Sequence, residues 1–547
     1  ACSKLVMPKP SLRSPGLQAI TREILANVSE IERGGGAEAI ARQHAKTRLT
    51  ARQRIDLLLD RGASRLELGL WAGYLMYDSW GGAPAAGVVT LIGRVADRSC
   101  MIIANDATVK AGSFFPQTVK KVLRSQRIAM ENRLPLIYLV DSAGVFLPLQ
   151  DEVFPDEDDF GRIFRNNAVI SASGVPQFAA IMGNCVAGGG YLPVLCDKLL
   201  MTDGSGLYLA GPALVKAAVG QEISHEELGG ALMHAAVSGT VDYREPNDEA
   251  CIERLRRLVA NLPPDMTARV FTPEPARAAS RAPEEILELF PADPREQYDV
   301  RAVLDCLLDT DSFDEYKPEY GKSMVCGTAR LGGYRVGVVA NQHKNVKPAD
   351  GPIQFGGVIY VDSADKAARF IMDCNQLRLP ILFFQDVNGF MVGRDSEREG
   401  IIRAGAKLVN VISNSVVPKI TVILGGSYGA GNYALCGKAF DPRFIFAWPT
   451  ARYAVMGGQQ AASTLLDITI SAMRREGKNP DADELEPLRQ QVAASYDEQT
   501  DIRYAAARGW VDAIIDPATT RDVLLHSLQI VTRHDDGKPF HTGVLQV

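Results

Sequence analysis

Two glycine-rich turns are the segments of this 547-residue chain best suited to chemistry. The first is Ala187-Gly188-Gly189-Gly190-Tyr191, and the second is Gly426-Ser427-Tyr428-Gly429-Ala430-Gly431-Asn432-Tyr433. Each follows an apolar run that predicts a strand. Consecutive glycines allow positive φ angles and let a ligand approach the peptide plane closely. If a helix starts after such a turn, its first N–H groups lack internal partners and attract negative charge. Either turn could therefore bind a phosphate or stabilise a developing oxyanion.

Neither turn fits the common phosphate motifs. A Walker motif needs a Lys-Ser/Thr pair, and a dinucleotide fingerprint needs Gly-x-Gly-x-x-Gly after the first strand of the fold. A purely structural role remains open, in which the glycines let a helix pack closely on a strand. Because two equivalent turns occur in a duplicated chain, we favour the functional interpretation.

Side chains suited to acid–base catalysis are scarce around these turns. The chain has seven histidines, and none recurs at equivalent positions of the repeat. We interpret His234 and His343 as solvated or packed residues. Asp141 and Asp386 recur at predicted strand ends, and we interpret them as turn-capping carboxylates. A site built from backbone N–H groups can still work if the substrate or a cofactor takes the proton.

The bulk composition excludes several functional classes. A net charge of −6 without a dense Lys/Arg tract gives no reason to expect nucleic-acid binding. Nine scattered cysteines without Cys-x-x-Cys spacing argue against a zinc ribbon and indicate reduced thiols. No run approaches the ~20 apolar residues that span a bilayer, and the start has no adequate signal-peptide core. We therefore expect no membrane span, no bound metal, and a cytoplasmic location, or the mitochondrial matrix if the source is eukaryotic.

A long internal repeat organises the chain. Pro135 and Pro380, Asp141 and Asp386, and Gly144 and Gly389 are the recurring pairs, each 245 positions apart. A repeat of this length indicates a duplicated domain rather than a solenoid unit. Seven of the 30 prolines fall within residues 262–295, which predicts a linker. The predicted domains are therefore 1–270 and 296–547, joined by a linker at 271–295.

Strands and helices alternate in both halves, which predicts an α/β fold. In the first half we expect helices at 15–60, 116–133 and 159–173, and strands at 87–95, 100–104, 136–140 and 177–182. Thr50 is the expected N-cap of a helix that starts at Ala51. In the second half we expect strands at 325–329, 335–340, 381–385 and 419–424, and helices at 363–377 and 400–413. Residues 468–504 read as an appended pair of helices.

The quoted motifs together resemble one family over most of the chain. They are Leu49-Thr-Ala-Arg-Gln-Arg-Ile55, Asn105-Asp-Ala-Thr-Val-Lys-Ala-Gly112, Asp141-Ser-Ala-Gly144, Phe160-Gly-Arg-Ile-Phe164, Gly211-Pro-Ala-Leu-Val-Lys-Ala-Ala218, Gln385-Asp-Val-Asn-Gly-Phe-Met-Val-Gly393, the two glycine turns and Ala507-Arg-Gly-Trp-Val-Asp512. The chain resembles the carboxyltransferase (β) subunit of biotin-dependent acyl-CoA carboxylases. This resemblance implies two tandem crotonase-like (ClpP/crotonase) domains related by internal duplication.

The resemblance also implies a reaction and a division of labour. The N-terminal domain would bind the acyl-CoA and the C-terminal domain the biotin. Carboxybiotin would supply CO2 to the α or vinylogous γ carbon of an acyl-CoA and take up the substrate proton. N–H groups of Gly188, Gly189 and Gly190 map to the thioester oxygen. Those of Gly429, Ala430 and Gly431 map to the biotin ureido oxygen. Tyr428, Asn432, Phe390, Tyr191 and Lys216 map to the binding of biotin or the coenzyme A thioester.

Partners follow from the same resemblance. The chain has no Met-Lys-Met biotinylation motif, so a biotin carboxylase and biotin carrier α subunit is expected on another polypeptide. Self-association, most simply a β hexamer within an α6β6 complex, would place one copy's acyl-CoA site against another copy's biotin site. The motifs are most similar to the methylcrotonyl-CoA and geranyl-CoA branch. Val186, Gly190 and Asp386 depart from that branch. The subunit of a sodium-pumping decarboxylase of the glutaconyl-CoA type, a propionyl- or acetyl-CoA carboxylase β subunit, and a degenerate scaffold remain alternatives.

Overall fold

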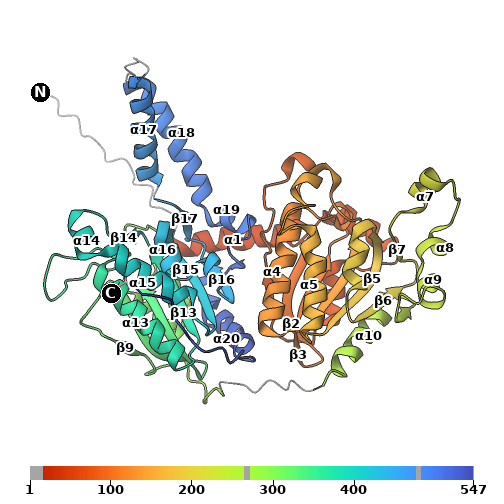
Figure 1. Ribbon diagram of the computed structural model, residues 1–547, viewed down its shortest axis with the longest axis horizontal. Coiled ribbons are helices and arrows are strands. Elements are labelled where there is room, and N and C mark those ends of the chain that lie inside the picture. The colour runs from red at the N-terminus through yellow and green to blue at the C-terminus, as the bar shows by residue number, and fades with distance from the viewer. Residues whose placement is uncertain (1–15, 264–271, 457, 476–481, 546–547) are drawn as a thin grey trace, which may run out of the picture.

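The computed structural model describes residues 16–263, 272–456, 458–475 and 482–545. Within these ranges the chain forms two eight-stranded mixed sheets, which lie in two bodies side by side (Figure 1). No helix in these ranges is long and apolar enough to cross a membrane.

The two sheets have the same strand order. The first runs β1-β2-β3-β4-β5-β6-β8, and the second runs β9-β10-β11-β13-β15-β16-β18 when read from the matching edge. A side strand pairs with the fifth position in each, β7 with β5 and β17 with β15. The first three strands are antiparallel and the later pairs are parallel in both sheets. The duplication that the sequence predicted is therefore confirmed strand by strand.

The first sheet and its main helices have clear bounds. Its strands are β1 Leu66–Leu68, β2 Val88–Val95, β3 Arg98–Asn105, β4 Leu136–Ser142, β5 Gln177–Val186, β6 Lys198–Thr202, β7 Gly206–Tyr208 and β8 Tyr243–Glu245. Helices α3 (Ala51–Leu58) and α10 (Asp248–Ala260) cover one face, and α4 (Pro116–Asn132) and α5 (Phe160–Ala172) lie on the other. Thr50 caps α3 as predicted, since its side chain accepts from the Gln53 N–H.

The second sheet repeats this arrangement. Its strands are β9 Asp314–Tyr316, β10 Met324–Leu331, β11 Tyr334–Asn341, β13 Ile381–Val387, β15 Lys419–Tyr428, β16 Phe444–Ala447, β17 Arg452–Ala454 and β18 Ala513–Ile514. Helices α12 (Val300–Leu307) and α20 (Thr520–Val531) take the places of α3 and α10, while α13 (Val361–Gln376) and α15 (Ile401–Ser413) take those of α4 and α5. A two-stranded sheet, β12 (Val358–Ile359) with β14 (Gly389–Phe390), lies beside it.

Individual side-chain contacts repeat as well. Thr118 and Ser363, 245 positions apart, each accept a hydrogen bond from the N–H of the N-cap residue of their helix, Phe115 and Tyr360 respectively. Lys121 and Lys366 have the same spacing and are both buried. Their ammonium groups donate to pairs of strand-end carbonyls, Ala85 and Val88 in one half and Gly321 and Met324 in the other. These contacts tie each helix to the start of the second strand of its own sheet, β2 or β10.

Two segments join the halves more closely than the sequence suggested. Helix α1 (Leu17–Ile31) places Ile24 and Ile31 in a core cluster with Ile423 and Ile445 of the second sheet. In the predicted linker, residues 283–289 are helical, and Ile286 and Phe290 are buried. Residues 283–290 of this proline-rich segment are therefore packed against the rest of the protein rather than extended.

Each half carries a helical arm at the same point of its repeat. In the first half α7 (Pro212–Val219), α8 (His225–Gly229) and α9 (Ala231–Ala236) fill the interval between β7 and β8. In the second half α17 (Gly458–Arg475), α18 (Ala482–Thr500) and α19 (Ile502–Ala507) fill the interval between β17 and β18, and α17 and α18 project as a pair (Figure 1). The expectation of an appended helix pair at 468–504 is thus corrected. The pair begins at Gly458, and the repeat resumes after it with β18 and α20.

Candidate active site: two equivalent glycine turns

The first glycine turn follows directly from β5, which is longer than predicted and extends to Val186. A short 3-10 helix covers Ala187–Gly190, and α6 (Tyr191–Val194) continues it. Gly189 faces the loop after β4, where a Cβ on Gly189 would lie 3.9 Å from the Cα of Gly144. Gly144 has a φ of 90°, a conformation that favours glycine.

The second turn is built in the same way. β15 extends to Tyr428, and α16 (Gly429–Ala434) follows at once. A Cβ on Gly431 would lie 3.3 Å from the Cα of Gly389, whose φ of 127° is again open to glycine alone among common residues. The N-cap residue of α16, Tyr428, does not cap the start of this helix with its side chain. These N–H groups are the kind of donors that an oxyanion requires.

A matched β-bulge supports each turn. The pairing of β4 with β5 shifts register between Val140 and Ser142, and that of β13 with β15 shifts between Gln385 and Val387. The residue in each bulge is an aspartate, Asp141 or Asp386. Its carboxylate accepts from a backbone N–H on the neighbouring strand, at 3.1 Å from Asn184 and at 2.7 Å from Gly426. Both aspartates therefore bind the neighbouring strand rather than capping a turn, as we had expected them to do.

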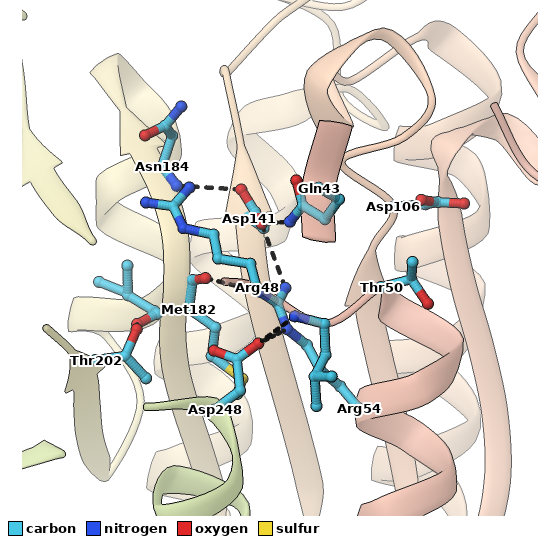
Figure 2. A network of polar contacts seen from close by, with 12 residues as sticks. Gln43, Arg48, Thr50, Arg54, Asp106, Asp141, Met182, Asn184, Thr202 and Asp248 are labelled. Atoms are coloured by element: carbon cyan, nitrogen blue, oxygen red, sulfur yellow. Dashed lines mark hydrogen bonds and ion pairs between the residues drawn. The ribbon is translucent and has the colours of Figure 1, made fainter. Parts of the chain in front are cut away.

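A buried arginine neutralises the first bulge aspartate (Figure 2). Arg54 is 1% exposed, and its guanidinium donates to Asp141 at 3.3 Å, Asp248 at 2.8 Å and the Met182 carbonyl at 2.7 Å. Gln43 donates to the same oxygen of Asp141 at 3.0 Å. This network joins α2 (Gly36–His44), α3, β4, β5 and α10.

Histidine and tyrosine take the place of arginine at the second bulge. His343 Nδ1 lies 3.0 Å from Asp386 Oδ2, and the Tyr298 hydroxyl donates to the same oxygen at 2.9 Å. Burial opposes the charged form of His343, but Asp386 and the Pro294 carbonyl outweigh it and raise its pKa. His343 is therefore a packed residue, as expected, and these side chains line a cavity of about 280 Å³. His234 is half-exposed and contacts the Leu207 carbonyl at 2.7 Å.

The first turn also borders a cavity that is mostly apolar. Its volume is about 480 Å³, and Gly190, Tyr191, Val194, Leu207, Leu209 and Val215 are among its lining residues. A Cβ on Gly190 would lie 3.1 Å from Leu207, so the absence of a side chain here keeps this end of the cavity open. The arrangement suits an apolar group placed next to backbone N–H donors.

Comparison with known proteins agrees with this geometry. The family model described as carboxyl transferase domain matches residues 42–541. The probable mitochondrial methylcrotonoyl-CoA carboxylase β chain of Drosophila melanogaster is 44% identical over 517 residues, which cover 92% of this chain and 87% of that protein. The chain belongs to the carboxyl transferase domain family.

A further relative and a solved structure support the same family and fold. The biotin-dependent 3-methylcrotonyl-coenzyme A carboxylase β1 subunit of Mycobacterium tuberculosis is 44% identical, with 90% of each chain covered. The crystal structure of the P. aeruginosa geranyl-CoA carboxylase β subunit superposes with a TM-score of 0.85 at 35% identity, covering 99% of this chain and 100% of that one. The chain is therefore a carboxyltransferase with the crotonase-like fold, and the family and fold expectations are confirmed.

Within this carboxyltransferase, the predicted binding residues lie in different settings. Tyr191 is 52% exposed at the cavity of the first turn. The ring of Tyr428 lies against Gly426, and the ring of Phe390 packs on Gly405 of α15. Lys216 lies on the first-half arm and pairs with Glu222 at 2.5 Å. It does not lie at the turn itself.

Asn432 makes a hydrogen bond within its own half, and its part in ligand binding stays a prediction. Its amide nitrogen donates to Ser427 Oγ at 2.8 Å, so this end of the side chain turns inward toward the strand. The sequence interpretation also left Gly144 and Gly389 outside the site, although the structure places each against a turn glycine. Their spacing of 245 was visible, and it could have identified them as partners of the turns.

Proposed function

We propose that this carboxyltransferase moves a carboxyl group from carboxybiotin to a branched enoyl-CoA, with 3-methylcrotonyl-CoA or geranyl-CoA as the favoured substrates. The relatives with the highest identities named above are methylcrotonyl-CoA carboxylase β chains, and the structural neighbour acts on geranyl-CoA. The apolar cavity beside Gly190 supports a substrate whose acyl group is branched and uncharged.

The first turn is proposed to hold the thioester. The N–H groups of Gly188, Gly189 and Gly190 would donate to the thioester oxygen, which gains negative charge when the substrate loses a proton. The open position at Gly190 would admit the acyl group into the cavity, while Tyr191 borders it. Lys216, on the exposed arm, would contact the coenzyme A portion.

The second turn is proposed to hold the ureido oxygen of biotin. The first N–H groups of α16, from Gly429, Ala430 and Gly431, are of the donor type that a ureido oxygen accepts, and Phe390 and Tyr428 supply flat apolar surface nearby. Bound carboxybiotin would supply the carboxyl group and a basic nitrogen for the substrate proton. Residues of this chain would fix that group and exclude water, so no side-chain base is required.

The two half-sites are proposed to meet between copies. The turns lie in separate halves of one chain (Figure 1). The first-half arm and α6 expose large apolar side chains, which suits contact with a second copy: Tyr191, Val194, Leu209, Leu214, Val219, Leu232 and Val237. We propose a β hexamer that also binds a biotin carboxylase and biotin carrier α subunit.

One observation carries this proposal: two equivalent turns face two equivalent glycine loops, and the first borders an apolar cavity. The test is carboxylation of an acyl-CoA panel by the complex with its cognate α subunit, ATP and bicarbonate. Branched enoyl-CoAs should have the highest kcat/KM. If no member of the panel is carboxylated by a competent complex, the proposal is wrong.

Two alternatives share the fold. Propionyl-CoA carboxylation has support from a Haloferax mediterranei carboxyltransferase subunit, but at the lower identity of 35%. The panel separates this alternative, because propionyl-CoA would then exceed the branched substrates. A sodium-pumping decarboxylase predicts a membrane decarboxylase gene nearby instead of a biotin carboxylase gene.

A further inference from the structure

The two halves carry different residues at three structurally equivalent positions in and beside their glycine turns. Two landmarks set the alignment. Gly189 lies against Gly144 in the first half, and Gly431 lies against Gly389 in the second. Within the sheets, Cys185 pairs with Ser142 in the first half, and Ser427 pairs with Val387 in the second. In this alignment Val140, Cys185 and Gly190 of the first half correspond to Gln385, Ser427 and Asn432 of the second.

In the second half these residues form one hydrogen-bonded network, the Gln385–Ser427–Asn432 brace. The Ser427 hydroxyl donates to Gln385 Oε1 at 2.7 Å and accepts from Asn432 Nδ2 at 2.8 Å. Gln385 Nε2 donates to the Leu435 carbonyl at 2.7 Å and to the Asn432 carbonyl at 3.3 Å. The brace therefore connects β13 and β15 to the C-terminal half of α16, at Asn432 and Leu435.

Burial makes this network sensitive to the loss of any member. Gln385 is 0% exposed and Ser427 is 1% exposed. A buried donor or acceptor that loses its partner keeps its desolvation cost, so the remaining groups must move to find new partners. The groups that would move are attached to α16, whose first N–H groups form the second turn.

The first turn has no comparable support at these positions. Cys185 contacts the Gly189 carbonyl through Sγ at 3.6 Å, which is a weak hydrogen bond. Burial raises the pKa of the Cys185 thiol to about 12, so it remains neutral. Gly190 has no side chain and borders the apolar cavity. The first turn is thus open toward its cavity, whereas the second is held by the Gln385–Ser427–Asn432 brace.

A nucleophilic role for Ser427 does not fit its surroundings. Gly425-Gly426-Ser427-Tyr428-Gly429 matches the Gly-x-Ser-x-Gly pattern of hydrolase nucleophile elbows. A nucleophile elbow exposes its serine next to a histidine. The hydroxyl of Ser427 instead is buried and bonded to Gln385 and Asn432.

We propose that Gln385 and Ser427, acting through Asn432, are positioning residues for carboxyl transfer. They hold the second turn so that the N–H groups of Gly429, Ala430 and Gly431 meet the biotin ureido oxygen. This rests on the proposed function. Catalytic groups must be placed within about 0.5 Å of their productive positions, and a 1 Å displacement can cost about 100-fold in rate.

The test compares Ser427→Ala with wild type in the complete complex with its α subunit. We expect kcat to fall by roughly 10- to 100-fold, while the KM for the acyl-CoA changes by less than about twofold because the first turn is unaffected. Ser427→Cys, which introduces the residue of the first half and keeps a weak donor, should give an intermediate kcat.

Ser363→Ala is the matched control, because Ser363 is also a buried serine of the second half but caps α13. It should lower the melting temperature without the fall in kcat. If Ser427→Ala does not fold, Gln385→Met replaces it in the same comparison. Wild-type kcat in a folded brace variant overturns the proposal, as does an equal loss of kcat and acyl-CoA affinity. A wild-type complex that carboxylates no acyl-CoA refutes the proposed function, and the positioning role with it.

Discussion

At the residue scale, the two bulge aspartates show how a repeated position acquires different partners. Asp141 faces the permanent charge of Arg54, whereas Asp386 faces His343 and Tyr298. Both carboxylates still accept from the neighbouring strand. The bulge geometry is therefore retained in both halves, but in the second half its electrostatic support depends on protonation.

Arg54→Ala should destabilise the first half strongly. The change leaves Asp141 and Asp248 buried without their cation, and breaking such a buried pair costs about 3–5 kcal/mol. Arg65→Ala is the control, because its pair with Asp56 is exposed and contributes at most about 1 kcal/mol. Thermal unfolding of both variants checks this, and equal melting temperatures would contradict the role of the network.

His343→Gln should change how stability depends on pH. Because Asp386 holds the pKa of His343 above its ordinary value of 6.5, the stabilisation is complete below about pH 6.5 and is lost as pH rises through the folded-state pKa. The melting-temperature gap between wild type and variant should thus be largest at low pH and shrink on alkalinisation. His44→Gln, the same exchange at an exposed position, is the control. A gap that widens with pH would refute the ion pair.

At the element scale, close backbone approach determines where glycine is required. In each sheet a strand passes over a bulge aspartate with too little room for a side chain. A Cβ on Gly183 would lie 2.0 Å from Asp141 Oδ1, and one on Gly425 would lie 2.4 Å from Asp386 Oδ1. These glycines let the aspartates reach the strands that lead into the turns.

Gly425→Ala should therefore destabilise the protein by about 1–3 kcal/mol, as overpacking does. Gly161→Ala is a suitable comparison, because a Cβ at this position of α5 has no described heavy atom within 4 Å. That change should be neutral or stabilise by up to about 1 kcal/mol. Denaturant unfolding of the two variants measures the difference in the free energy of unfolding. A Gly425→Ala variant as stable as the wild type would show that the bulge is less constrained than the geometry implies.

Ala430→Pro tests the second turn itself. Proline is tolerated in the first turn of a helix but has no N–H. If this N–H contacts the ureido oxygen, kcat should fall by about 100-fold or more, as when an oxyanion-hole donor is removed. Binding of acyl-CoA, measured by titration calorimetry, should be unchanged. Equal loss of turnover and acyl-CoA binding would contradict the division between the turns.

The sequence predicted elements better than it predicted contacts. Apolar periodicity located the main strands and helices, and Thr50 was found because capping is a local interaction. The Arg54 network was not found, because its ion pairs connect residues 87 and 194 positions apart. Asn432 was assigned to ligand binding because its motif matched the family, and its hydrogen bond to Ser427 Oγ could not be predicted from that match. Strands β5 and β15 were also predicted too short, because Gly183 and Gly425 resemble turn residues.

At the scale of the whole molecule, the duplication gives one chain two similar but distinct glycine turns. The first turn opens to an apolar cavity, and the second is held by a polar brace. In the proposed function, one copy's first turn works with another copy's second turn. A chain defective in either turn alone would still contribute an intact half-site to its neighbour.

Subunit complementation tests this claim most directly. Gly189→Pro and Ala430→Pro β subunits would each be assembled with the α subunit, separately and after co-expression, and carboxylation of the preferred acyl-CoA measured. Each variant alone should be inactive. Random mixing in a closed oligomer should restore about a quarter of wild-type activity, because that fraction of facing pairs has two intact turns. Mixed complexes that remain inactive, although they contain both variants, would contradict the account.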